Sequence, residues 1–178
     1  MKKSESDDVP FAARIARQKR FKYFFNNRVS KNSAILKIGC GDRWLAGLLR
    51  QGGWLNYIGL DLKMPADIIG DIRNWHRLQL QPESMDIIVA FEILEHVECT
   101  SAIRQLLNPS GLLFATTPVP SLDWVCKIME TIGLNQKRTS SHDCLVDLRR
   151  IEGFEIVSYR KVMGISQWGV LKRSGCRS

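Results

Sequence analysis

The sequence predicts an α/β fold of three layers, with a seven-stranded, mostly parallel sheet between helices and an antiparallel last strand. Short apolar runs alternate with segments of helical periodicity from residue 34 onwards, which favours strands joined by crossover helices. The run "MDIIVAF" (85–91) is apolar without interruption, as expected for a strand buried on both faces. The last two runs, 154–162 and 166–173, are joined by a short connection and should therefore pair antiparallel.

The order of the elements follows from these runs and from the residues that stop them. We expect strands over 34–38, 56–62, 66–72, 85–91, 111–118, 154–162 and 166–173. We expect helices over 11–27, 44–51, 98–108, 121–133 and 141–153. Gly52-Gly53 should end the second helix, and Pro109 and Gly111 the third. The 178 residues are expected to form one domain over 10–173, after a disordered segment 1–9 and before a tail 174–178.

The first helix, "FAARIARQKRFKYFFNN" (11–27), is basic and amphipathic. Pro10 suits its first turn. Its apolar residues include Phe11, Ile15 and Phe25. A helix of this kind can lie on a membrane surface, but more often it packs on its own domain, and that is what we expect here.

The positive charge of the chain is concentrated at its two ends. Of the net charge of +8, residues 1–31 contribute nine Lys/Arg against three Asp/Glu, and residues 159–178 contribute five Lys/Arg and no acid. Such ends can attract an anionic partner such as RNA, phospholipid or a phosphorylated substrate. We favour a solvated basic helix and tail, because no RNA-binding motif is present. We expect no DNA partner and no transmembrane segment, and the sequence leaves a homo-oligomer open.

The cysteines and the first residues indicate the compartment. Five cysteines, none of them in a CxxC pair, disfavour a zinc site and a disulfide framework, so we expect no metal. The start "MKKSESDDVPF" has no apolar stretch of the kind that a secretory signal needs. A reducing cytoplasm is therefore the expected location.

A glycine turn follows the first predicted strand in "ILKIGCGDRW" (35–44). Glycines such as Gly39 and Gly41 let the backbone approach a ligand, and the start of the helix that follows favours negative charge. Asp61 ends the second strand, where an acid can accept both hydroxyls of a ribose. Asp71 follows, where a carboxylate with its neighbouring backbone groups can hold the edge of an adenine. The sequence therefore predicts a site for a nucleotide-like cofactor.

Five ordered blocks of the chain resemble the class I S-adenosylmethionine-dependent methyltransferases, especially the small-molecule group that includes the ubiquinone-biosynthesis type. The blocks are "ILKIGCGD", "YIGLDL", "IIGDI", "MDIIVAFEILEHV" and "LLNPSGLLFATTP". The resemblance implies a Rossmann-like methyltransferase fold and S-adenosylmethionine as cofactor. It implies these binding residues: Gly39, Cys40 and Gly41 under the methionine half, Asp61 and Leu62 at the ribose and adenine, Asp71 and Ile72 at the adenine, and Phe91 and Glu92 at the sulfonium.

The resemblance places Glu95 and His96 at the rim of the site. Methyl transfer from an activated donor needs mainly alignment and exclusion of water. A base helps where the acceptor is a hydroxyl, and the candidates are Glu92 and His96. The families that methylate base amino groups carry an Asn/Asp-Pro-Pro-Tyr/Phe motif after the fourth strand, where this chain has "FEILEH". We therefore expect a small-molecule or lipid-precursor acceptor.

Two residues depart from the family pattern. Lys37 stands where the family has an acid near the amino group of the methionine half, and its charge should repel a cofactor that carries an ammonium and a sulfonium. Its long stem also lets it swing away. Arg43 replaces a third glycine, and we expect its side chain to point to water. Lys37 keeps open a second interpretation, a catalytically weak or inactive methyltransferase-like scaffold or regulatory subunit.

A third interpretation is a nicotinamide-dependent oxidoreductase, whose fingerprint is GxGxxG. The third glycine of that fingerprint would fall on Trp44. A side chain of that size prevents the close helix packing that the motif needs beneath a pyrophosphate, so we disfavour this interpretation.

Overall fold

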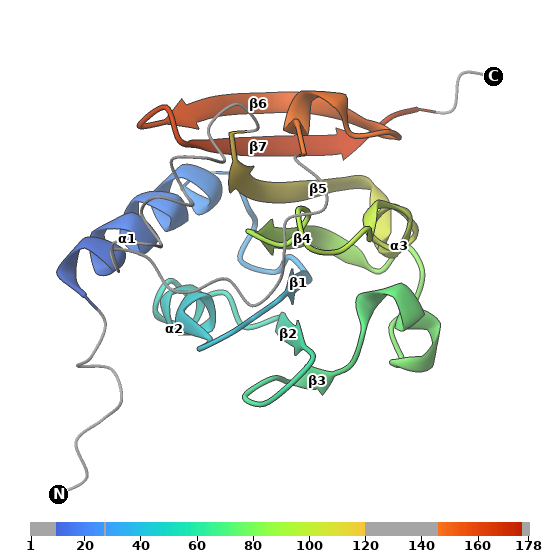
Figure 1. Cartoon of the computed structure of the whole chain (residues 1–178). Coiled ribbons are helices and arrows are strands. Elements are labelled where there is room, and N and C mark those ends of the chain that lie inside the picture. Colours follow the sequence, from blue (N-terminus) through green and yellow to red (C-terminus); the bar gives the residue numbers. More distant parts are fainter. Residues whose placement is uncertain (1–9, 27, 120–145, 176–178) are drawn as a thin grey trace, which may run out of the picture.

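The computed structural model describes residues 10–26, 28–119 and 146–175, which form a seven-stranded sheet in the order β3-β2-β1-β4-β5-β7-β6 (Figure 1). The strands are β1 Ile35–Ile38, β2 Tyr57–Asp61, β3 Ile68–Ile69, β4 Met85–Phe91, β5 Leu107–Pro118, β6 Phe154–Val162 and β7 Ser166–Arg173. All pairs from β3 to β5 are parallel, whereas β7 is antiparallel to both β5 and β6. The predicted fold class is confirmed.

The parallel strands end at one edge of the sheet, which we call the carboxyl edge. β6 ends there too, because β7 lies antiparallel between it and β5. The chain leaves the centre of the sheet in one direction from β1 to β2 and in the other from β4 to β5. Ligands of open α/β sheets bind beyond the carboxyl ends of the strands at such a reversal. The topology therefore places the expected site between the ends of β1 and β4.

Helices cover both faces of the sheet. On one face α1 (Phe11–Phe25) and α2 (Trp44–Gln51) pack over strand residues such as Ile35, Val89 and Phe114. On the other face lie α3 (Thr100–Leu106) and the short 3-10 helices η2 (Ile72–Arg77) and η4 (Leu148–Arg150). Alternation of side chains along each strand produces these two cores. None of the helices in the described ranges is long and apolar enough to cross a membrane.

α1 packs on the sheet through its C-terminal half only. Phe24 and Phe25 are fully buried, and Phe24 lies 5.0 Å from Phe91 and 5.2 Å from Phe114 between ring centroids. Aromatic rings at such separations add to the free energy gained from burial. The expectation that the helix packs on its own domain is therefore confirmed for this half. Phe11 and Ile15 in the first half are exposed.

Two predicted elements are shorter than expected. The helix predicted over 98–108 ends at Leu106, and residues 107–110 belong to β5 because Leu107 pairs with Met85 and Asn108 donates to the Asp86 carboxylate at 2.6 Å. The strand predicted over 66–72 is observed only as the two residues of β3. It ends early because the Asp71 side chain accepts a hydrogen bond from the Arg73 backbone N–H and thereby caps the start of η2. Short polar side chains that bond nearby backbone groups compete with strand pairing in this way.

The helix predicted over 141–153 is wrong for its described part. Residues 148–150 form only the short η4, and Ile151 is extended. The reason is tertiary: Gln167 accepts from the Leu148 backbone N–H and donates to the Val146 carbonyl, so these groups have partners outside a helix. The helix predicted over 121–133 and the segments 1–9 and 176–178 lie outside the described residues, as does Asn27 at the end of the first helix.

Candidate functional site

The glycine turn after β1 forms an open cradle at the carboxyl edge. Gly39 and Gly41 have φ of +64° and +52°, which glycine adopts without strain. A Cβ on Gly39 would lie 2.2 Å from Ile93 Cδ1, so a side chain there would have to displace Ile93. A Cβ on Gly41 would meet no described atom within 4 Å. Cys40 is buried between them, where its Sγ donates to the Pro65 carbonyl at 3.4 Å and burial raises the pKa of the thiol.

Asp61 lies at the end of β2, next to this turn. One oxygen of its carboxylate accepts a hydrogen bond from the Gly41 N–H at 2.9 Å and the other from the Leu62 N–H at 2.8 Å. Each carboxylate oxygen can accept a further bond. The carboxylate is half-buried, so it can fix the turn and still receive donors from a ligand. Leu62 beside it is exposed.

Asp71 and Ile72 follow β3 and differ in what they can offer. The Asp71 carboxylate pairs with the Arg73 guanidinium at 2.5 Å, and hydrogen bonds from Arg73 hold the pKa of Asp71 below its usual range. Arg73 is largely exposed, and water screens an ion pair of this kind, so a ligand can displace it. The Ile72 side chain is buried in the core and leaves little surface for a ligand.

Phe91 and Glu92 lie where β4 ends. Glu92 has φ of +54°, a conformation that a non-glycine residue adopts at a cost and that is frequent at functional sites. Its Oε1 accepts from the Thr116 hydroxyl at 2.8 Å and from the Arg20 guanidinium at 3.2 Å. Phe91 is buried against Phe24 and stacks on Trp44 at 6.2 Å. The packing fixes both residues at the carboxyl edge.

Lys37 points into the core beneath the glycine turn. The side chain is 3% exposed, and its ammonium donates to the Gly39 carbonyl at 2.8 Å and lies 5.3 Å from the centroid of the Phe91 ring. Burial, and next the charge of Arg20, lower the pKa of Lys37 from 10.5 to about 8. The side chain has therefore not swung away. It supports the turn from below and leaves the surface above Gly41 open.

Glu95 is buried, which corrects its predicted place at the rim. It is 4% exposed and follows β4 in the turn that also carries Glu92. Burial, and next the charge of Glu92, raise the pKa of Glu95 to about 8, so its carboxyl is mainly protonated at neutral pH. His96 is exposed in the same turn, and its backbone N–H donates to the Ile93 carbonyl at 2.9 Å. A cavity of about 270 Å³ borders both residues.

Arg20 lies at the candidate site, although no sequence pattern predicted it there. It comes from α1, pairs with Glu92, and lies over the rings of Phe91 at 5.3 Å and Trp168 at 5.8 Å. Burial lowers its pKa and Glu92 opposes the effect, but a guanidinium keeps its charge in proteins. Helical spacing could have indicated this position of Arg20. Arg17, Arg20 and Phe24 lie on the same face of α1, and this face meets the sheet.

Arg43 does not point freely to water as predicted. Its guanidinium pairs with Asp67 at 2.6 Å and so ties the start of α2 to the segment before β3. Arg43 has φ of +60°, which explains why this position suits glycine. A second ion pair, between Arg17 and Asp42 at 2.6 Å, fastens α1 to the glycine turn. Both contacts brace the turn from its sides.

Comparisons with known proteins agree with this arrangement. The sequence profile of a family described as "Methyltransferase domain" matches residues 11–160. The fold is similar to that of a protein from Pyrococcus horikoshii OT3, with a TM-score of 0.68 and 15% identity over 94% of each chain. It is also similar to an S-adenosylmethionine-dependent methyltransferase from Mesorhizobium loti, with a TM-score of 0.53 and 15% identity over 82% of this chain and 94% of the other. No curated protein matches the sequence significantly.

Proposed function

The chain belongs to the S-adenosylmethionine-dependent class I methyltransferases, with S-adenosylmethionine as its cofactor, and we propose that it methylates a small-molecule or lipid-precursor acceptor. The observation that carries the proposal is Glu92, a carboxylate held at the end of β4 by Thr116 and Arg20. A carboxylate there can accept a proton from an acceptor that enters at the carboxyl edge. Membership of the ubiquinone-biosynthesis type stays a prediction.

The residues at the carboxyl edge fit the adenosine half of the cofactor. Gly41 offers backbone with open space above it, and Asp61 has acceptor capacity left for the hydroxyls of a ribose. Asp71 would accept from the adenine amino group once Arg73 gives way. Leu62 is exposed and available to cover the ring, whereas Ile72 would contribute through its backbone, since its side chain belongs to the core.

The methionine half needs a balance of charges, and Arg20 and Glu92 supply it. The cofactor has a carboxylate, an ammonium and a sulfonium in this half. Arg20 is a half-buried cation next to the site and would pair with the carboxylate, while Glu92 would face the positive groups. Lys37 remains a nearby cation, but its ammonium is hydrogen-bonded to the Gly39 carbonyl under the turn rather than above it. Its repulsion is therefore weaker than an ammonium in the open site would cause.

The chain's own residues would align the acceptor and take up its proton. The cofactor supplies a methyl group that is already activated by the positive sulfur to which it is attached. Phe91 and Trp44 would shield the reacting atoms from water, because their rings stack on each other at the end of β4. Glu92 would accept the proton of a hydroxyl or ammonium acceptor. Glu95 is mainly protonated at neutral pH and can share a proton with Glu92. His96 is a second candidate base, exposed at the edge of the turn.

A substitution of Glu92 tests the role of this carboxylate. Glu92→Gln should lower the rate at which S-adenosylhomocysteine is formed from S-adenosylmethionine by about a hundredfold, because a positioned base contributes on this scale. Small phenols, amines and thiols would serve as acceptors. Glu98→Gln is a matched control, since Glu98 is exposed in the same segment. An equal loss in both variants, or none in Glu92→Gln with an active acceptor, would contradict the role.

A further inference from the structure

One side of α1 presents an apolar and basic surface that the sheet does not cover. Phe11 is 76% exposed, and Ile15, one turn later, is exposed on the same side of the helix. Both line a shallow groove together with Arg14, Gln18, Lys19 and Lys22. The whole of α1 carries no Asp or Glu. We call these six residues the outer face of α1.

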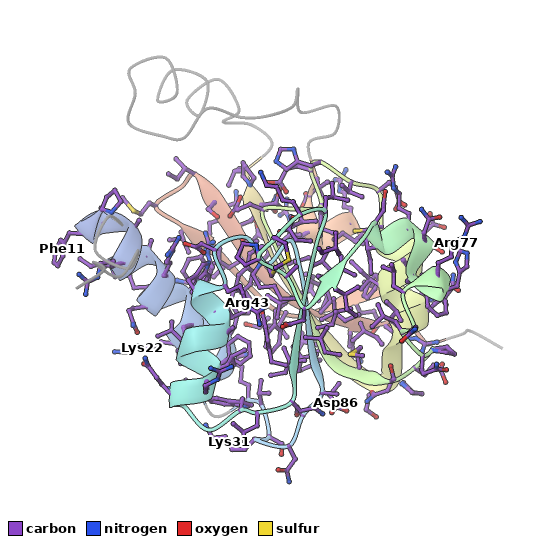
Figure 2. The ribbon with its side chains drawn as sticks, turned by 90° about the horizontal axis from the view of Figure 1, so that it is seen from below. Phe11, Lys22, Lys31, Arg43, Arg77 and Asp86 are labelled. Carbon is purple, nitrogen blue, oxygen red and sulfur yellow. The ribbon has the colours of Figure 1, made fainter. Side chains whose placement is uncertain are left out.

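The N-terminal part of the outer face, with Phe11, Arg14 and Ile15, lies at the carboxyl edge. α1 runs against the direction of the parallel strands, because Arg17 and Arg20 contact Asp42 and Glu92 beyond the strand ends, whereas Phe25 contacts Trp54 before the start of β2. At a rise of about 1.5 Å per residue, Phe11 lies about 9 Å farther along the helix than Arg17. Figure 2 shows Phe11 at the free end of α1, far from Lys31 and Asp86, which mark the opposite edge.

Other exposed apolar side chains border the same edge. Leu62 and Met64 follow the end of β2 and are both exposed, and Met163 at the turn between β6 and β7 is 88% exposed. Lysines stand beside them in the chain, at 63 and 161, and both are exposed. The carboxyl edge thus combines apolar tips with positive charge, and these tips come from three separate elements.

We propose that the carboxyl edge docks on a membrane surface rich in anionic lipid. Helices that lie in a membrane interface have a basic polar part beside exposed apolar side chains, as the outer face of α1 does. Anionic lipid attracts each basic residue near the surface, and the apolar tips enter the headgroup region. Single-stranded RNA is favoured less, because its bases stack on aromatic rings and most of the exposed tips are aliphatic or methionine.

Docking in this orientation turns the glycine turn and Glu92 toward the lipid, since both lie at the same edge. If the proposed function holds, the acceptor is an amphiphile that the enzyme takes from that bilayer. The docking itself is independent of methyl transfer and is measured without an acceptor.

Sedimentation of the full chain with vesicles tests the docking. The protein should sediment with vesicles of equal parts phosphatidylglycerol and phosphatidylcholine, but not with vesicles of phosphatidylcholine alone. Phe11→Ser should weaken the binding about tenfold, because an aromatic side chain no longer leaves water. Arg14→Glu should weaken it about thirtyfold, because two units of charge change near the surface. Added salt should release the protein.

Matched controls come from the opposite edge. Leu55→Ser removes an apolar side chain that is 80% exposed just before β2, and Arg50→Glu reverses an exposed charge near the end of α2. Both should leave vesicle binding close to that of the wild type. Equal losses in Leu55→Ser and Phe11→Ser, or no sedimentation with anionic vesicles, would overturn the proposal. Displacement by a short RNA with no effect of Phe11→Ser would identify a nucleic-acid surface instead.

Binding of S-adenosylhomocysteine, followed by calorimetry in the same variants, separates this proposal from the proposed function. Phe11→Ser and Arg14→Glu should bind S-adenosylhomocysteine as the wild type does. A protein that binds vesicles but not S-adenosylhomocysteine would keep the docking surface and contradict the enzyme function. A protein that binds S-adenosylhomocysteine but not vesicles would overturn the docking surface and leave the enzyme function standing.

Discussion

Replacing Lys37 by methionine removes a charge that the fold buries at the end of β1. The pKa of Lys37 falls from 10.5 to about 8 on folding, mainly through burial. Each tenfold change in proton affinity corresponds to about 1.4 kcal/mol, so carrying the charge costs the folded state about 3 kcal/mol at neutral pH. Methionine has a similar length but cannot donate to the Gly39 carbonyl, and the loss of that bond costs about 1 kcal/mol. Lys37→Met should therefore be more stable than the wild type by about 2 kcal/mol at pH 7.

The stability gained by Lys37→Met depends on pH. Below pH 8 both the folded and the unfolded wild type hold the proton, so the cost is fully present. Between about pH 8 and 10.5 the folded state releases the proton and the unfolded state keeps it, so the wild type becomes more stable as the pH rises. Above that range the cost is gone, and only the lost hydrogen bond separates the two proteins. The advantage of Lys37→Met should thus vanish and reverse to about −1 kcal/mol.

Urea unfolding of both proteins from pH 7 to pH 10.5 measures this difference, and other titrating groups cancel in it. Lys22→Met makes the same chemical change at an exposed position and should alter the free energy of unfolding by less than about 0.5 kcal/mol at every pH. A Lys37→Met variant that is less stable than the wild type at pH 7 would refute the reasoning. So would a difference that does not change with pH.

Two further predictions concern packing and the buried carboxyl. Phe24→Ala should lower the free energy of unfolding by about 3–5 kcal/mol, because the ring is fully buried among Phe91 and Phe114; a loss under 1 kcal/mol in thermal or urea unfolding would contradict this packing. The pKa of Glu95 rises from 4.5 to about 8 on folding, so the wild type loses stability as the pH rises between these values. Glu95→Gln should lack that loss and exceed the wild type in stability above pH 8, and parallel pH profiles of the two would disprove the assignment.

Continuous apolar runs and glycine spacing made most of the fold predictable. The run 85–91 is the buried strand β4 with the same bounds, since a strand covered on both faces has no other pattern. Gly39 and Gly41 have the positive φ angles that their place in the turn indicated. The helix over 141–153 failed because the hydrogen bonds that decide this segment come from Gln167, far along the chain.

The charged residues of the site could be predicted less well. A lysine in a strand next to a glycine turn can point into the core or away from it, and only the packing of Phe91 and Arg20 decides that Lys37 is buried. The resemblance places Glu95 at the rim of the site, yet the fold buries it in the interior. Arg20 lies before the first of the five blocks that resemble the family, so no motif pointed to it. Its role depends on how α1 packs across the sheet. Burial is a property of the folded chain and cannot be read from one segment.

We propose that Asp61 and the glycine turn form a cofactor site at the carboxyl edge. Calorimetric titration of the wild type and of Asp61→Asn with S-adenosylhomocysteine, with NAD as a control ligand, tests it most directly. We predict binding of S-adenosylhomocysteine by the wild type and none of NAD. Binding to Asp61→Asn should be about tenfold to a hundredfold weaker, because hydrogen bonds to a charged acceptor are lost. A folded wild type that does not bind S-adenosylhomocysteine, or an Asp61→Asn variant with unchanged affinity, would contradict the account.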